Sequence, residues 1–188
     1  MKKITLAAAI IFASVTAFAQ GWTLDKNHAK LGFTVTHLLI SDVDGQFKNF
    51  DVKVTATKDD FSDAVIELTA DVNSINTDND YRDNDLKSPK FFDAAKFPTL
   101  SFKSTSIKKI DAKNYKLSGN LTMHGVTKAV ELNVIYNGTI TSPMSKKPVA
   151  GFKIKGTVKR SDFDIATSTP NAIVSDEVEL NANIELDK

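Results

Sequence analysis

Three histidines, His28, His37 and His124, are the side chains best suited to metal binding or general-base chemistry. No His-x-His or His-x-x-x-His spacing places two of them on one element, so a zinc site would have to be assembled from distant segments. His37 falls on the apolar phase of an expected strand, whereas His28 and His124 fall in turns. We therefore expect no metal site and no catalytic residue, and structural or ligand-contacting hydrogen bonds for the histidines.

Other patterns that carry chemistry are incomplete. Segments 42–45 and 78–85 are rich in acidic and amide side chains, but neither has the alternating oxygen ligands and sixth-position glycine of a calcium loop. The sequence has no Gly-x-Ser-x-Gly motif, no phosphate-binding loop and no identifiable acid–base pair of carboxylates. It has no cysteine, which excludes disulfides and a catalytic thiol. These absences favour a protein that is not an enzyme and needs no cofactor.

Alternation of apolar and polar residues predicts that most of the chain is β-strand. About eight long strands joined by short turns are typical of an antiparallel barrel or sandwich, and closure is favoured because it removes long exposed edges. We predict an all-β fold, a single eight-stranded antiparallel barrel, with a polar turn at 41–45 and a hairpin turn at His124-Gly125. The expected strands cover residues 21–25, 31–37, 46–56, 64–72, the region of 100–102, 115–123, 126–136, 149–160 and 178–186.

One short helical segment, at about residues 78–93, interrupts this pattern. Thr77 as N-cap and acidic residues in the first turn predict a helix over 78–87, and Ser88-Pro89 predicts a further helical turn. Arg82 lies in this helix and would pair with Asp83, Asp85 or a strand-end carboxylate to anchor it, or contact a ligand headgroup; we favour anchoring.

Phenylalanines follow the helix at positions 91, 92 and 97, and we expect them to plug one end of the barrel. An eight-stranded barrel is just wide enough to hold one small ligand, although the same inward side chains are compatible with a solid core. The expected lining of an apolar cavity comprises Phe33, Val35, His37, Phe50, Val52, Ile66, Leu68, Phe91, Phe92, Phe97, Leu100, Phe102, Leu117, Leu121, Leu132, Val134, Phe152 and Ile154.

The chain has 188 residues, 41% of them hydrophobic, and a formal net charge of +1, which fits one globular domain without a strong field for nucleic acid. Residues 1–19 have a basic start, an apolar run and a small-x-small site, the pattern of a signal peptide cleaved after Ala19. We expect residues 20–188 to be exported to the periplasm, without stable membrane insertion.

Several separated motifs resemble one known family. They are Trp22–His28, Phe33–His37, Val43–Phe47, Ile75–Thr77 with Arg82–Leu86 and Phe91–Asp93, Phe97–Phe102, Gly119–Lys128 and Arg160–Phe163. In this order they are similar to the YceI-like polyisoprenoid-binding proteins, which are exported lipocalin-like barrels. The family often has histidine where Asp85 stands, and glycine after Arg160–Phe163 where Asp164 stands, so no role is transferred to Asp85 and an altered turn is expected at Asp164.

The resemblance favours a hollow barrel that binds a long-chain isoprenoid or similar amphipathic lipid without chemistry, for transport, storage or stress protection. Two alternatives stay open from the sequence. One is an enzyme that acts on an apolar substrate in the same cavity, with His37 or His124 as its base. The other is a solid β-domain that serves as an envelope interaction module. The expected partner is a lipid, not a nucleic acid, and a homodimer is left open.

Overall fold

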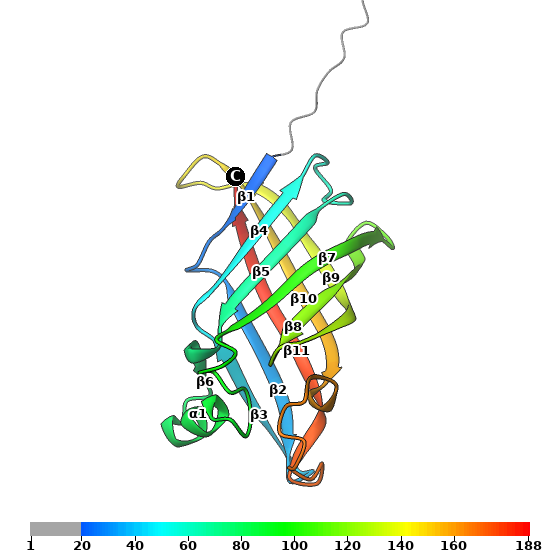
Figure 1. Cartoon of the computed structure of the whole chain (residues 1–188). Coiled ribbons are helices and arrows are strands. Elements are labelled where there is room, and N and C mark those ends of the chain that lie inside the picture. The colour runs from blue at the N-terminus through cyan, green and yellow to red at the C-terminus, as the bar shows by residue number, and fades with distance from the viewer. Residues whose placement is uncertain (1–19) are drawn as a thin grey trace, which may run out of the picture.

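The computed structural model describes residues 20–188 (Figure 1), so the expected signal peptide and cleavage site lie outside the described residues. In the described part, the strands are β1 (Gln20–Leu24), β2 (Lys30–His37), β3 (Ser41–Phe47), β4 (Phe50–Ala56), β5 (Val65–Asp71), β6 (Ile75–Asn76), β7 (Thr99–Lys109), β8 (Asn114–Met123), β9 (Val126–Thr141), β10 (Pro148–Lys159) and β11 (Val174–Asp187). The helices are α1 (Asp80–Lys87) and two 3₁₀ turns, η1 (Val72–Ser74) and η2 (Arg160–Phe163). No described helix has the length and apolar character to cross a membrane.

Eight strands form a closed antiparallel barrel in the order β1-β4-β5-β7-β8-β9-β10-β11, which confirms the predicted fold class. The ring closes where β1 pairs with β11, with Leu24 opposite Leu186. Strands β2, β3 and β6 extend the wall sideways, because β2 pairs with the earlier part of the same β11 edge that β1 uses at its end. In Figure 1 this extension lies at the lower end of the barrel, beside α1, and the C-terminus lies at the upper end.

The prediction of a turn at 41–45 is wrong. Strand β3 begins at Ser41 and pairs with β2 throughout, and the turn is the apolar segment 38–40. The acidic residues of 41–45 contact the neighbouring strand β2 instead, since Asp44 accepts a hydrogen bond from the Thr34 hydroxyl (2.5 Å). The single strand expected at 46–56 is also interrupted, because β3 ends at Phe47 and β4 begins at Phe50.

The helix is shorter than predicted. Asn79, not Thr77, is the N-cap of α1, and its side chain accepts a hydrogen bond from the Arg82 amide (3.0 Å). Thr77 is buried, and its amide and hydroxyl donate to the Asp83 carboxylate (2.8 and 2.6 Å). The residues after Ser88 form hydrogen-bonded turns and not a further helical turn.

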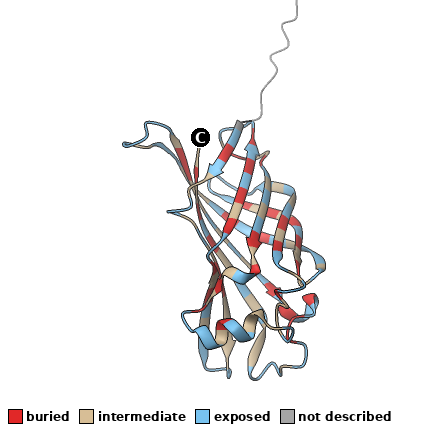
Figure 2. Cartoon of the chain, turned by 60° about the vertical axis from the view of Figure 1, so that its left-hand side comes forward, coloured by how far each residue is buried: buried red, intermediate tan, exposed pale blue. Residues whose placement is uncertain are grey.

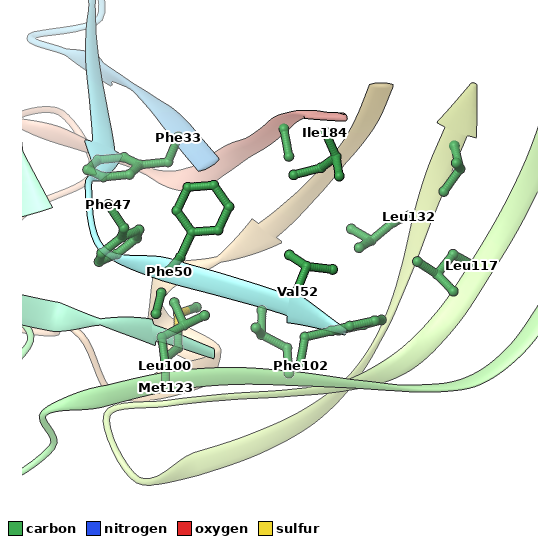
Figure 3. Close-up of a cluster of buried hydrophobic side chains, with 14 of the residues drawn as sticks. Phe33, Phe47, Phe50, Val52, Leu100, Phe102, Leu117, Met123, Leu132 and Ile184 are labelled. Carbon is green, nitrogen blue, oxygen red and sulfur yellow. The ribbon is translucent and has the colours of Figure 1, made fainter. Parts of the chain in front are cut away.

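Alternation along the strands separates a buried inner face from an exposed outer face (Figure 2). In β4, for example, Phe50, Val52 and Val54 are buried, and Lys53 between them is exposed. Figure 3 shows side chains from several strands meeting in the barrel interior. The expected tight hairpin is confirmed between β8 and β9, where His124 and Gly125 have φ of 52° and 76°, as the two central residues of a type I′ turn require.

Candidate ligand cavity

An apolar cavity of about 150 Å³, the upper chamber, occupies the interior of the barrel. Among the residues that line it in the described structure, none is charged, and Asn181 is the only polar side chain. Alternation on the barrel strands produces this lining, because every second side chain points inward. Of the predicted lining residues, those found here are Phe33, Val52, Ile66, Leu68, Leu100, Phe102, Leu117, Leu121, Leu132, Val134, Phe152 and Ile154.

A second cavity of about 340 Å³, the lower chamber, lies between β2, β3, the α1 segment and the segment that precedes β11. The predicted residues Val35, His37, Phe91 and Phe92 line it. Polar groups are also present in this lining, among them Arg82, Asp85, Lys90 and Arg160. The two chambers adjoin, because Phe33, Phe47, Leu100, Met123 and Leu180 form part of both walls.

Two predicted lining residues face neither chamber. Phe50 is buried in the core beside the upper chamber but does not line it. Phe97 packs edge-on against the His124 ring, with 4.8 Å between the ring centroids. It fits closely over Gly125, where a Cβ atom would lie 2.5 Å from the Phe97 ring. Of the expected aromatic plug, only Phe91 and Phe92 therefore reach the cavity, and ligand contact by the lining residues stays a prediction.

Phe61 is a lining residue of the upper chamber that the sequence analysis missed. It lies in the polar β4–β5 turn with φ of 58°, and it is only 2% exposed. Its ring centroid lies 4.9 Å from that of Phe152, 5.0 Å from that of Trp22 and 5.5 Å from that of Tyr136. The sequence signal that could have identified it is a single phenylalanine within the acidic segment 59–63, where an apolar side chain is unexpected. The turn folds back so that aromatic rings cover the upper end of the barrel.

Arg82 anchors the segment before α1. Its guanidinium donates from Nε to the Thr77 hydroxyl and from Nη2 to the Thr77 carbonyl, both at 2.8 Å. The expected ion pair with Asp83 or Asp85 is not formed, because Thr77 lies between Arg82 and Asp83 and bonds to both. Arg82 therefore bonds to the segment before α1 and also lines the lower chamber, and its anchoring role stays a prediction.

Arg160 organises the other wall of the lower chamber. Its side chain is buried and donates hydrogen bonds to backbone carbonyls from Ile165 to Ser175. The loop held in this way contributes Ile165, Thr169 and Ile173 to the chamber. Directly before this loop, Asp164 caps η2 with φ of 57°, the left-handed conformation that glycine prefers, so the turn forms even without glycine.

The three histidines lie in different parts of the described structure. His37 lines the lower chamber, whereas His124 Nδ1 lies 3.1 Å from the Phe163 carbonyl and lines neither chamber. His28 Nδ1 lies 2.7 Å from Asp25 Oδ2, with Glu185 nearby, in the one group of three potential metal ligands found among residues 20–188. The hydrogen bond lowers the pKa of Asp25 and raises that of His28. This ion pair accounts for the arrangement, and the absence of a metal stays a prediction.

A closed antiparallel barrel with an apolar interior and polar groups toward one end is the architecture of lipocalin-type ligand-binding barrels. The chain belongs to the YceI-like domain family, whose model matches residues 22–186.

Relatives support the same assignment. The chain is 37% identical to Protein YceI of Salmonella newport over 180 residues, which cover 95% of this chain and 92% of that protein. The crystal structure of the Campylobacter jejuni YceI protein is similar, with a TM-score of 0.72, 34% identity and coverage of 88% of this chain and 96% of that one. A polyisoprenoid-binding domain from Saccharophagus degradans shares the fold at 14% identity and a TM-score of 0.64, covering 88% and 97% of the two chains.

Proposed function

We propose that the protein is a non-enzymatic binding protein that holds a long-chain isoprenoid or similar amphipathic lipid, for transport, storage or stress protection. The observation that carries this proposal is the upper chamber, whose lining contains no charged side chain. An apolar cavity of this size lined by Leu, Ile and Phe tends to stay dry and to accept apolar ligands. The polyisoprenoid-binding description of the Saccharophagus degradans domain adds support for the ligand class.

The two chambers together suit a molecule with one apolar and one polar end. Burying a CH₂ group contributes about 0.8 kcal/mol, so a dozen carbons distributed over the two adjoining chambers would give a gross gain of roughly 10 kcal/mol. Ordering and association costs reduce this gain, which still leaves room for micromolar binding. The tail would extend from the lower chamber into the upper chamber, and the headgroup would lie near Arg82 and Lys90 in the lower chamber.

We further propose that the mature protein works in the periplasm after cleavage following Ala19, with the lipid as its partner. The basic start and apolar run of residues 1–19 support export. Of the two candidate bases of the enzyme alternative, His124 lines neither chamber, whereas His37 lines the lower chamber, so His37 is the base that this alternative would need. A solid interaction module is disfavoured by the cavities themselves.

Mass spectrometry of the native protein, followed by organic extraction, tests the proposal. We expect a stoichiometric polyprenyl or fatty-chain mass. Leu121→Trp, which fills the upper chamber, should lose that mass, whereas Val65→Trp on the exposed outer face should keep it. Circular dichroism would show that both variants fold, since overpacking costs about 1–3 kcal/mol. A clean apo mass together with no uptake of added isoprenoids would refute the proposal.

A further inference from the structure

The turn between β2 and β3 presents a group of exposed apolar side chains, here called the β2–β3 tip and consisting of Leu38, Leu39, Ile40 and Ile173. Their exposure ranges from 44% for Ile173 to 84% for Ile40. Ile173 belongs to this group although it is distant in sequence, because the Leu38 amide donates a hydrogen bond to its carbonyl (3.0 Å). Single exposed apolar residues are ordinary on protein surfaces, but a contiguous group marks a surface that meets another apolar phase.

The backbone conformation of the tip is unfavourable for leucine. Leu38 and Leu39 have φ of 51° and 62°, in the left-handed region where glycine or asparagine is favoured in hairpin turns. Consecutive leucines at these positions add conformational strain, and their exposed side chains gain nothing from the core. The stability of the fold therefore does not explain why leucines occupy these positions. A contact between the tip and another molecule would explain them.

The β2–β3 tip lies beside the lower chamber. His37 and Val43, on the strands that flank the turn, line this chamber, and so does Ile173 of the tip itself. In Figure 1 the β2–β3 hairpin forms the lower extremity of the molecule, beside the start of β11. Apolar side chains therefore continue from the tip into the lining of the lower chamber, a lining that also includes the charged residues Arg82, Asp85, Lys90 and Arg160.

We propose that the β2–β3 tip docks on the surface of a lipid bilayer and holds the lower chamber open to the acyl-chain region, so that lipid is exchanged there. This inference rests on the proposed function as a lipid-binding protein. A second copy of the chain fits the tip less well, because four side chains offer a few hundred Å², below the roughly 800 Å² per partner of a standard stable interface.

Charges beside the tip indicate the kind of bilayer. Asp42 and Asp44, the nearest charged residues along β3, are exposed, so the flank of the tip is acidic. A strongly anionic membrane would repel these carboxylates, whereas a zwitterionic surface would accept the apolar tip. Docking should accordingly depend on apolar contact and change little with salt.

Flotation with phosphatidylcholine–phosphatidylethanolamine vesicles tests the docking step directly. We expect Leu39→Asp combined with Ile40→Asp to lower vesicle partitioning at least tenfold. Met144→Asp is the matched control, because Met144 is 92% exposed in the β9–β10 turn at the opposite end of the barrel, and it should leave partitioning unchanged. Equal partitioning of the double variant and the wild type would overturn the proposal, and so would an equal loss in the control.

Two further measurements separate this inference from the proposed function. Uptake of farnesol from solution should be the same in the wild type and the double variant, while transfer of a fluorescent isoprenoid from vesicles should fall at least tenfold in the variant. Absence of farnesol uptake in both would argue against the proposed function, whatever the vesicle result. Sedimentation velocity that showed a dimer abolished by the double variant would assign the tip to a second copy and overturn membrane docking.

Discussion

Replacing Arg160 with methionine tests whether one buried cation holds the lower wall of the cavity. Arg160 is 5% exposed, and its Nε, Nη1 and Nη2 atoms all donate hydrogen bonds, at 2.5–3.2 Å. The acceptors are the backbone carbonyls of Ile165, Ala166, Thr169, Val174 and Ser175 and the side-chain oxygen of Asn171. In Arg160→Met, these oxygens lose the charged guanidinium that donates hydrogen bonds to them.

The expected loss in the free energy of unfolding follows from the hydrogen bonds that the carbonyl groups lose. A buried acceptor left unpaired costs about 1–3 kcal/mol, and a hydrogen bond to a charged group contributes about 1.5–3 kcal/mol. These contributions are not additive, and water that enters would satisfy some acceptors, so we expect a net loss of about 3–5 kcal/mol. For a domain of this size that corresponds to a Tm lower by roughly 10 °C. Lipid retention should fall as well, because the loop that Arg160 holds lines the lower chamber.

Urea unfolding and calorimetry would measure this loss. Lys159→Met, at the exposed neighbouring position, is the control and should change the free energy of unfolding by less than about 0.5 kcal/mol. Arg160→Lys keeps the charge but has fewer donors, and it should lie between the wild type and Arg160→Met. A loss of less than about 1 kcal/mol for Arg160→Met would refute the reasoning that the guanidinium organises the wall.

Three other perturbations give distinct results. Gly45→Ala would place a Cβ atom 2.2 Å from the ring of Phe33, which lines both chambers and would have to shift. Titration calorimetry should then show long-chain lipid binding weakened ~10-fold or more, and unchanged affinity would contradict this. Arg82→Ala should lower Tm and lipid retention together, whereas lost binding at an unchanged Tm would indicate a headgroup contact. For His28→Gln, the sign of the pH dependence follows from the pKa of His28, which the Asp25 carboxylate raises above 6.5: the stabilisation is present below pH 6.5 and is lost as the pH rises through the raised pKa. Between pH 6 and 9, the free energy of unfolding should therefore fall less steeply with pH in His28→Gln than in the wild type. The same pH dependence in both proteins would contradict the ion pair.

The barrel could be predicted because its signal is local and repeated. Alternation along a strand decides which side chains point inward, so spacing alone predicts an inward position for residues such as Ile66 and Leu68, which line the upper chamber. The hairpin at His124-Gly125 was predictable for a similar reason, since glycine there matches the required backbone conformation.

The errors come from residues whose role depends on a distant partner. Asp44 indicated a turn, but pairing with β2 made it a strand residue. Thr77 has the chemistry of an N-cap, yet Asp83 and Arg82 engage it instead. Phe61 lies in a polar turn, and only the rings across the barrel explain why it folds inward. In each case the deciding contact is tertiary and leaves little trace in the local pattern.

The seam between β1 and β11 has a consequence for how the molecule folds. Thr23 pairs with Asp187, so the contact that closes the ring joins residues 164 positions apart. Contacts of such long separation form late, because the entropy of closing the intervening loop must be overcome first. The wall should therefore assemble as an open, curled sheet before its first and last strands meet. The seam, with few paired residues, is also where hydrogen exchange should report the earliest opening of the native ring.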